Sequence, residues 1–227
     1  MQINKINHID MLSDEEISKI ISSDLLSIKA VFLRPDEPFT WASGILSPIY
    51  CDNRLTLTSK DIRCDVENGL ATLVKKHFPE AEVLMGTATA GIAHAAITAH
   101  ILDLPMGYVR SSQKDHGRKN LIEGRIYPGQ KVVVVEDLIS TGKSSISTVL
   151  ALRDAGADVI GIASIFTYDM EKSKNMLNEN SIKNFSLTNF DSVIETAARE
   201  NYISQESIKP LLAFRDNPDD ESWYKNL

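Results

Sequence analysis

The chain has 227 residues, a formal net charge of -7 at pH 7 and a pI near 5.3. This length suits one α/β domain, and the negative charge argues against a broad nucleic-acid-binding surface. Its two cysteines, Cys51 and Cys64, form no metal-type CxxC pair and fit a reducing compartment. The N-terminus lacks an apolar export segment, and no stretch approaches 18 apolar residues, so we expect a soluble cytoplasmic protein without membrane or nucleic-acid partners.

The first part of the chain predicts a helix, then a small lid. Residues 14–30 carry apolar side chains at helical spacing. Residues 31–50 are short apolar pieces broken by prolines, which favours hairpins over a helix. A second helix is predicted over residues 59–78, where Pro79 ends it.

Strands and helices then alternate. Strands are expected at residues 83–85, 106–110, 131–135 and 158–168, and helices at residues 92–102, 144–155 and, within a polar tail, near 191–200. This βα alternation predicts an α/β fold with a doubly wound parallel sheet. We expect one functional domain, with an N-terminal helix and hood (1–58), a core (59–170) and a C-terminal segment packing on the core or hood (171–227), including Trp223-Tyr224.

The most informative segment is residues 132–145, VVVVEDLISTGKSS. Four valines suit a strand buried on both faces, and Glu136 and Asp137 follow where open α/β sheets bind ligands. The next residues supply hydroxyls, a glycine and a helix start at Ser144 or Ser145, whose free N–H groups favour an anion. The segment indicates carboxylates for sugar hydroxyls beside a cradle for a phosphate.

Two other interpretations compete for this segment. A Walker A loop needs a glycine five positions before Gly142, and Asp137 stands there. An ordinary capped turn would explain the valines and serines but not two adjacent acids, which repel unless a cation or hydroxyl-rich ligand offsets them.

Residues 86–91, GTATAG, form a second candidate phosphate site between a strand and a helix. Only small residues occur, so the backbone can approach a pyrophosphate at the positive end of the next helix. The loop fails as a Rossmann fingerprint because Ala88 takes the middle-glycine place. Alone, it fits a tightly packed turn equally well.

Residues 110–129 form a polar, cationic stretch in an acidic protein. Such a loop suits an anionic partner, although a solvated surface loop is the plain alternative. The basic residues are Arg110, Lys114, His116, Arg118, Lys119 and Arg125.

Three segments together resemble a known family. Residues 132–145 resemble the ribose-phosphate signature of type I phosphoribosyltransferases. Residues 110–117 resemble the catalytic loop of orotate phosphoribosyltransferases, and residues 39–54 resemble the hood that covers the pyrimidine base in that family. The likeness spans about residues 25–225 and is strongest to the Gram-positive bacterial form.

The resemblance implies transfer of a phosphoribosyl group from phosphoribosyl pyrophosphate (PRPP) to orotate, with Mg2+ held mainly through substrate oxygens and no firm protein ligand. It also implies a homodimer whose catalytic loop reaches the neighbouring subunit. The implied catalytic residues are Lys114, His116 and Asp137. The implied PRPP-binding residues are Arg110, Lys114, His116, Glu136, Asp137, Leu138, Ile139, Ser140, Thr141, Gly142, Lys143 and Ser144. The pyrophosphate loop would comprise Thr87, Ala88, Thr89, Ala90 and Gly91, and orotate would contact Ser140, Arg54 and Tyr50.

The chain departs from the family pattern at four positions. Ala42, Ala90 and Ser111 stand where many members have lysines, and Tyr168 stands where many have an arginine for orotate. The resemblance therefore assigns the diphosphate charge to the loop cations, backbone N–H groups and Mg2+. Two alternatives remain, a phosphoribosyltransferase for another base and a PRPP-sensing regulator. The regulator is disfavoured because only about 30 residues precede the body.

Overall fold

The computed structural model describes residues 9, 11–40, 44–111 and 121–225. Its centre is a six-stranded sheet with the strand order β10-β9-β8-β5-β6-β7. The strands are β5 (Val83–Thr87), β6 (Met106–Val109), β7 (Ile122–Glu123), β8 (Lys131–Ile139), β9 (Asp158–Thr167) and β10 (Asn184–Asn189). Five of them run parallel, and only the edge strand β7 runs antiparallel to its neighbour β6.

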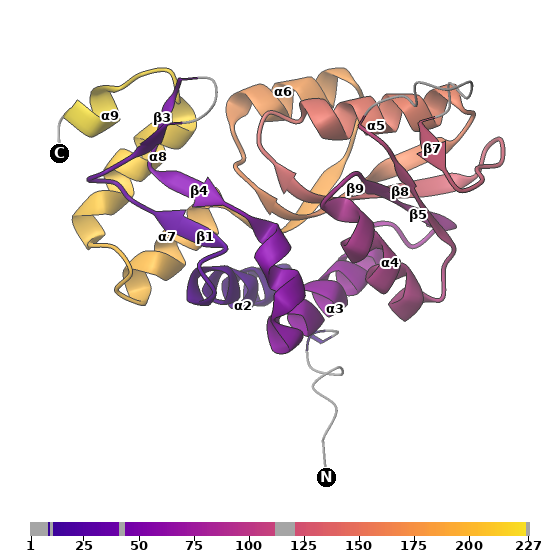
Figure 1. Ribbon diagram of the computed structural model, residues 1–227, viewed down its shortest axis with the longest axis horizontal. Coiled ribbons are helices and arrows are strands. Elements are labelled where there is room, and N and C mark those ends of the chain that lie inside the picture. Colours follow the sequence, from indigo (N-terminus) through magenta and orange to yellow (C-terminus); the bar gives the residue numbers. More distant parts are fainter. Residues whose placement is uncertain (1–8, 10, 41–43, 112–120, 226–227) are drawn as a thin grey trace, which may run out of the picture.

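Helices cover both faces of this sheet (Figure 1). One face carries α2 (Asp14–Ser27), α3 (Lys60–His77) and α4 (Gly91–Leu102), and the other carries α5 (Lys143–Asp154) and α6 (Glu171–Glu179). Side chains alternate between the faces of a strand, so the valines of β8 divide between the two cores. Val133 and Val135 pack with the first helices, whereas Val132 and Val134 pack with α5. The predicted α/β fold is confirmed.

The predicted hairpin region forms two small antiparallel sheets beside the main one. Strand β1 (Val31–Leu33) pairs with β4 (Ile49–Cys51), and β2 (Phe39–Thr40) pairs with β3 (Leu46–Ser47). We call residues 31–58 the hood, including the 3-10 helix η1 (Asn53–Thr58).

The C-terminal part of the chain lies beside the hood in Figure 1. It comprises α7 (Phe190–Arg199), the 3-10 helix η2 (Gln205–Ser207), α8 (Ile208–Asp216) and α9 (Ser222–Lys225). Trp223 packs back on the body as expected, because it is buried with its ring centroid 5.5 Å from that of Phe214. This segment also supplies β10 to the central sheet, which the sequence pattern did not predict.

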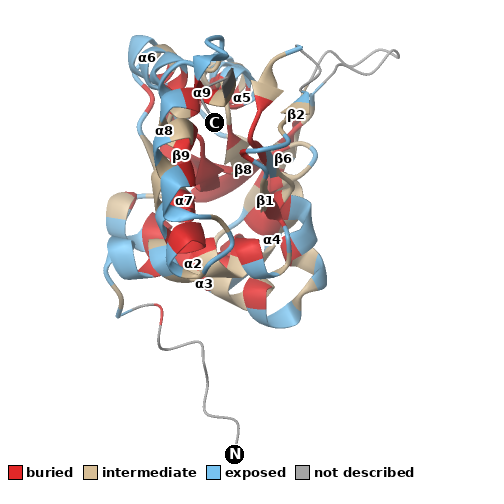
Figure 2. Ribbon diagram, turned by 90° about the vertical axis from the view of Figure 1, so that its left-hand side faces the viewer, coloured by how far each residue is buried: buried red, intermediate tan, exposed pale blue. Residues whose placement is uncertain are grey.

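Several boundaries differ from the expected ones. Strand β8 continues four residues past Val135, because Leu138 and Ile139 still pair with β9. The acid pair therefore lies within the strand, and Figure 2 shows β8 and β9 in the buried centre of the molecule. Helix α5 starts at Lys143, one residue earlier than expected. None of the helices in the described part of the chain has the length and apolarity needed to cross a membrane.

Candidate active site

The two predicted phosphate loops meet in one cavity of about 310 Å³. Strands β5 and β8 are parallel neighbours, with Gly86 opposite Val135, so the segments that follow them emerge at the same edge of the sheet. The cavity is lined by residues 87–90 of the first loop and by residues 136–138, 140–142 and 144 of the second. Side chains about 50 positions apart in the sequence thus share one site.

The acid pair divides into a buried and a half-buried carboxylate. Glu136 is 4% exposed, and its carboxylate accepts hydrogen bonds from Ser145 Oγ at 2.9 Å and the Asp137 backbone N–H at 3.1 Å. Burial raises the pKa of Glu136 to about 8, and the negative charge of Asp137 adds to the shift. Both causes disfavour the charged form of Glu136.

The phosphate cradle is the turn from β8 into α5. Gly142 has φ +79°, in the left-handed region that favours glycine. It is also the N-cap of α5, and no side chain caps the first turn. By contrast, Ser13 forms a full capping box at α2. The first N–H groups of α5 thus keep no side-chain acceptor and are available to an anion.

The second loop brings the start of α4 against β8. A Cβ built on Gly91 would lie 2.5 Å from the Val135 carbonyl oxygen, so only glycine permits this approach. Helix α4 also lacks a side-chain cap. Thr87 is buried, and its hydroxyl has no hydrogen-bond partner among the described residues. Both helices that begin at the cavity therefore present uncapped N–H groups to it.

Arg110 lies at the edge of the same region. It lines an adjoining cavity of about 250 Å³ that shares Thr87, Ala88 and Ser144 with the first and also includes Lys143. Its Nη1 atom is 3.9 Å from Glu123 Oε1 on β7. Lys114 and His116, predicted as catalytic residues, lie outside the described residues, as does Ala42.

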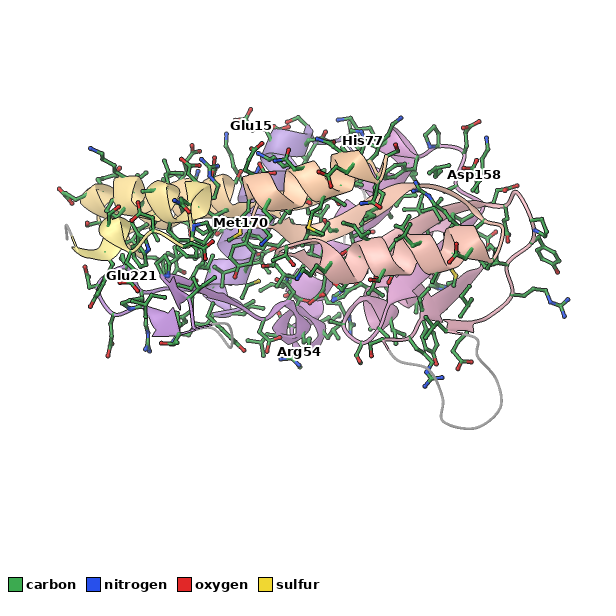
Figure 3. All side chains as sticks on the ribbon, turned by 90° about the horizontal axis from the view of Figure 1, so that it is seen from above. Glu15, Arg54, His77, Asp158, Met170 and Glu221 are labelled. Carbon is green, nitrogen blue, oxygen red and sulfur yellow. The ribbon has the colours of Figure 1, made fainter. Side chains whose placement is uncertain are left out.

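The residues predicted to bind the base lie on the hood. Tyr50 on β4 is 49% exposed, and its ring centroid is 5.8 Å from that of Phe39. Arg54 donates two hydrogen bonds to Asp52, at 2.6 and 2.8 Å, and its side chain is 65% exposed. The pKa of Arg54 is raised mainly by Asp52, with smaller contributions from Tyr50 and Asp137. Figure 3 shows Arg54 projecting from the surface.

Tyr168 occupies the position where many family members carry an arginine for orotate. It is 3% exposed, and its ring packs against Phe166 and Phe190 at centroid distances of 5.3 and 6.1 Å. Burial raises the pKa of its hydroxyl. Tyr168 is therefore a core aromatic residue rather than a substitute for the arginine.

Two contacts of the acid pair were not anticipated. Ser145 was expected only as a helix start, yet its hydroxyl binds Glu136. The sequence pattern assigns no function to Asn53, yet its side-chain amide donates to the Asp137 carbonyl at 2.6 Å. No local sequence signal marks Asn53, because its partner is 84 positions away.

A larger cavity, of about 790 Å³, lies between the hood and the C-terminal segment, lined by residues 33–37, 201–204, 206 and 207. It contains none of the predicted site residues. We assign the site to the smaller cavity because paired carboxylates and uncapped helix starts meet there, and volume alone defines no chemistry.

Fold and site together define a phosphoribosyltransferase-like arrangement, and comparison with known proteins agrees. The family model described as "Phosphoribosyl transferase domain" matches residues 65–197. The orotate phosphoribosyltransferase of Bacillus subtilis (strain 168) is 51% identical over 215 residues, covering 95% of this chain and 100% of the relative. That of Listeria monocytogenes serotype 4b (strain F2365) is 56% identical over 209 residues, covering 92% and 99%.

A solved structure supports the same assignment. The crystal structure of orotate phosphoribosyltransferase from Aeropyrum pernix matches with a TM-score of 0.71 and 26% identity, covering 81% of this chain and 99% of that one. The chain belongs to the orotate phosphoribosyltransferase family.

Proposed function

We propose that this protein transfers the 5-phosphoribosyl group of PRPP to N1 of orotate, giving orotidine 5'-monophosphate and pyrophosphate in pyrimidine synthesis. The observation that carries the proposal is the single cavity in which Glu136 and Asp137 lie between residues 87–90 and residues 140–144. Carboxylates for a ribose thus stand between two cradles for phosphates, which matches the layout of PRPP. Family membership adds orotate as the acceptor.

Catalysis of this transfer depends chiefly on electrostatic stabilisation of the transition state. Breaking the ribose–diphosphate bond leaves positive charge on the sugar and a highly charged leaving group. Asp137 would stabilise the positive charge, and Glu136 would bind a ribose hydroxyl. Residues 140–144 would hold the 5'-phosphate, with Ser140 also reaching the base.

The diphosphate would lie against the other loop. Residues 87–91 offer backbone N–H groups and the start of α4, and Arg110 contributes a cation at the edge of the site. The resemblance to the family adds Lys114 and His116, with His116 suited to proton delivery near neutral pH. We propose that these two residues act from the neighbouring subunit of a homodimer.

Mg2+ fits this donor set as a substrate-held ion. Carboxylate and hydroxyl oxygens, the ligands that Mg2+ prefers, line the cavity. In the part of the chain that the structure describes, no group of three or more His, Cys, Asp or Glu side chains could hold a metal. We therefore propose binding mainly through diphosphate and ribose oxygens. The ion would offset charge on the leaving group.

The hood would recognise the base. Tyr50 presents an exposed ring for stacking, and Arg54 is a planar donor suited to the carboxylate of orotate. Arg54 is paired with Asp52, but its side chain is 65% exposed, so it can turn toward the carboxylate of a bound base. The free thiols of Cys51 and Cys64 suit action in the cytoplasm.

A side-by-side assay tests the proposal. The protein would be incubated with PRPP and Mg2+ and, separately, orotate, uracil, adenine or xanthine, and both pyrophosphate and nucleotide would be measured. We expect product with orotate and little with the other bases. Turnover of another base in place of orotate would contradict the assigned acceptor, and pyrophosphate release without nucleotide would contradict transfer.

A further inference from the structure

One buried side chain connects the hood to the acid pair. Asn53 begins η1 and is 1% exposed. Its Nδ2 donates to the backbone carbonyl of Asp137 at 2.6 Å, which is among the shorter amide–carbonyl distances found in proteins. Its Oδ1 accepts from the Cys51 thiol at 3.3 Å. Asn53 is therefore held on both sides, with its donor directed at the backbone of Asp137, the half-buried member of the acid pair.

The section of β8 that Asn53 contacts has less support than the rest of the strand. Among the described residues, β5 pairs with β8 only as far as Val135, whereas β9 continues to Ile139. The acid pair thus extends past one of its two neighbouring strands. A hydrogen bond from the hood adds a restraint on this less supported section.

Both hydrogen bonds of Asn53 favour the same orientation of its amide. Burial and the negative charges of Asp137 and Asp52 raise the pKa of Cys51, so the thiol stays protonated. A protonated thiol donates to the amide oxygen, which leaves the NH2 group for the Asp137 carbonyl. Cys51 thus donates to Asn53, and Asn53 donates to the Asp137 carbonyl, so the two hydrogen bonds run in one direction from the hood to the site.

We infer that Asn53 is a positioning residue, which fixes the backbone at Asp137 so that the carboxylate faces the ribose and couples the base-covering hood to the acid pair. This inference rests on the proposed function, because the reaction gives Asp137 its charge-stabilising role. A small displacement of that carboxylate would reduce stabilisation of the transition state. The phosphate contacts of residues 140–144 would be retained.

Asn53→Ala and a matched control, Asn68→Ala, test the inference. Asn68 is also buried, and its Nδ2 donates to the Cys64 carbonyl at 2.7 Å within α3, outside the site. We expect Asn53→Ala to lower kcat about tenfold or more, with the KM for PRPP within about threefold of wild type. Asn68→Ala should cause a comparable drop in Tm but leave kcat nearly unchanged.

Equal kcat values in the two variants would reject the role of Asn53. A rise in the KM for PRPP with kcat unchanged would reject it as well. If Asn53→Ala does not fold, Asn53→Ser keeps a small polar side chain that is too short to replace the amide donor, and the same criteria apply to it. Wild-type protein that is inactive with orotate would reject the proposed function and this inference with it. Active wild type with equal variants would reject the inference alone.

Discussion

The ribose-phosphate end of the site and the hood are built in different ways. The first is formed by β5 and β8, of five and nine residues, which lie inside a six-stranded sheet with helices on both faces. The hood consists of strands of two or three residues, and its two candidate base-binding side chains, Tyr50 and Arg54, are exposed. Stabilisation of charge demands fixed groups, and the central sheet supplies them.

The two regions are therefore suited to different functions. The paired acids can be held at one position because strands and a helix start surround them. The hood can exchange partners, since Arg54 already pairs with a carboxylate at its surface. Variants of the paired acids should therefore affect stability and turnover, whereas variants of the exposed hood side chains Tyr50 and Arg54 should affect binding of the base alone.

The largest expected effect concerns the buried Glu136. Its pKa lies near 8 in the folded protein and 4.5 ordinarily, so between these values the native state retains a proton that the unfolded chain has lost. The free energy of unfolding should fall as pH rises through this range, because the native state binds the proton more tightly. Glu136→Gln should escape that loss, because a neutral amide has no proton to lose.

Urea unfolding of wild type and Glu136→Gln at several pH values from 5 to 9 would measure this difference. Groups remote from Glu136 titrate in both proteins and cancel in the comparison. Parallel loss of stability in the two proteins would show that the buried acid is ionised throughout.

Asp137→Asn should reduce turnover about 10²-fold or more, because it removes the charge proposed to stabilise the ribose in the transition state. Steady-state kinetics would measure the loss, with circular dichroism to confirm folding. Asp158→Asn is the control, since Asp158 is an exposed acid at the opposite end of the sheet (Figure 3). Near-normal turnover of folded Asp137→Asn protein would contradict the role of the pair.

Mixed subunits test the proposal that Lys114 acts on the site of a neighbouring subunit. Lys114→Ala and Asp137→Asn proteins should each be nearly inactive but regain part of the activity when heterodimers form, because one hybrid site then holds both intact groups. Heterodimers purified with two different tags would be assayed. If they show no recovery, loop action between subunits is excluded, although the loop could still act within its own subunit.

Arg54→Ala should weaken orotate binding about tenfold to a hundredfold, since loss of a charge-assisted contact costs about 1.5–3 kcal/mol. PRPP binding should stay almost unchanged. Calorimetric titration of each ligand would separate the two effects. Arg34→Ala is the matched control, because Arg34 is an exposed hood arginine packed against the Phe32 and Phe39 rings. Equal losses for both ligands would assign Arg54 to the fold or the diphosphate.

The sequence predicted the ribose-phosphate end of the site well, because the residues that mark it are close together in the chain. Four valines, two acids and a glycine occur within 14 consecutive positions, so one strand and one turn bring them together. The edge strand β7 has only two residues and gives no periodic pattern. Strand β10 reads NFSLTN, whose polar side chains are satisfied by contacts such as that between Ser186 and Ser164 at 2.6 Å, so no apolar run marks it.

Contacts between distant segments could not be predicted. Asn53 meets Asp137 only after the hood folds onto the sheet. Glu67 and His94, on different helices, are buried together at 2.7 Å, and neither lies in a recognisable motif. The burial of Tyr168 likewise depends on Phe190 from α7, which packs against it from the C-terminal segment. Such contacts depend on tertiary packing rather than on local spacing.

A crystal structure of the protein with PRPP and Mg2+ would test the central claim most directly. The account predicts the 5'-phosphate on the N–H groups of residues 140–144, the ribose hydroxyls on Glu136 and Asp137, and the diphosphate beside residues 87–91. PRPP bound elsewhere, for example in the larger cavity between residues 33–37 and 201–207, would contradict it.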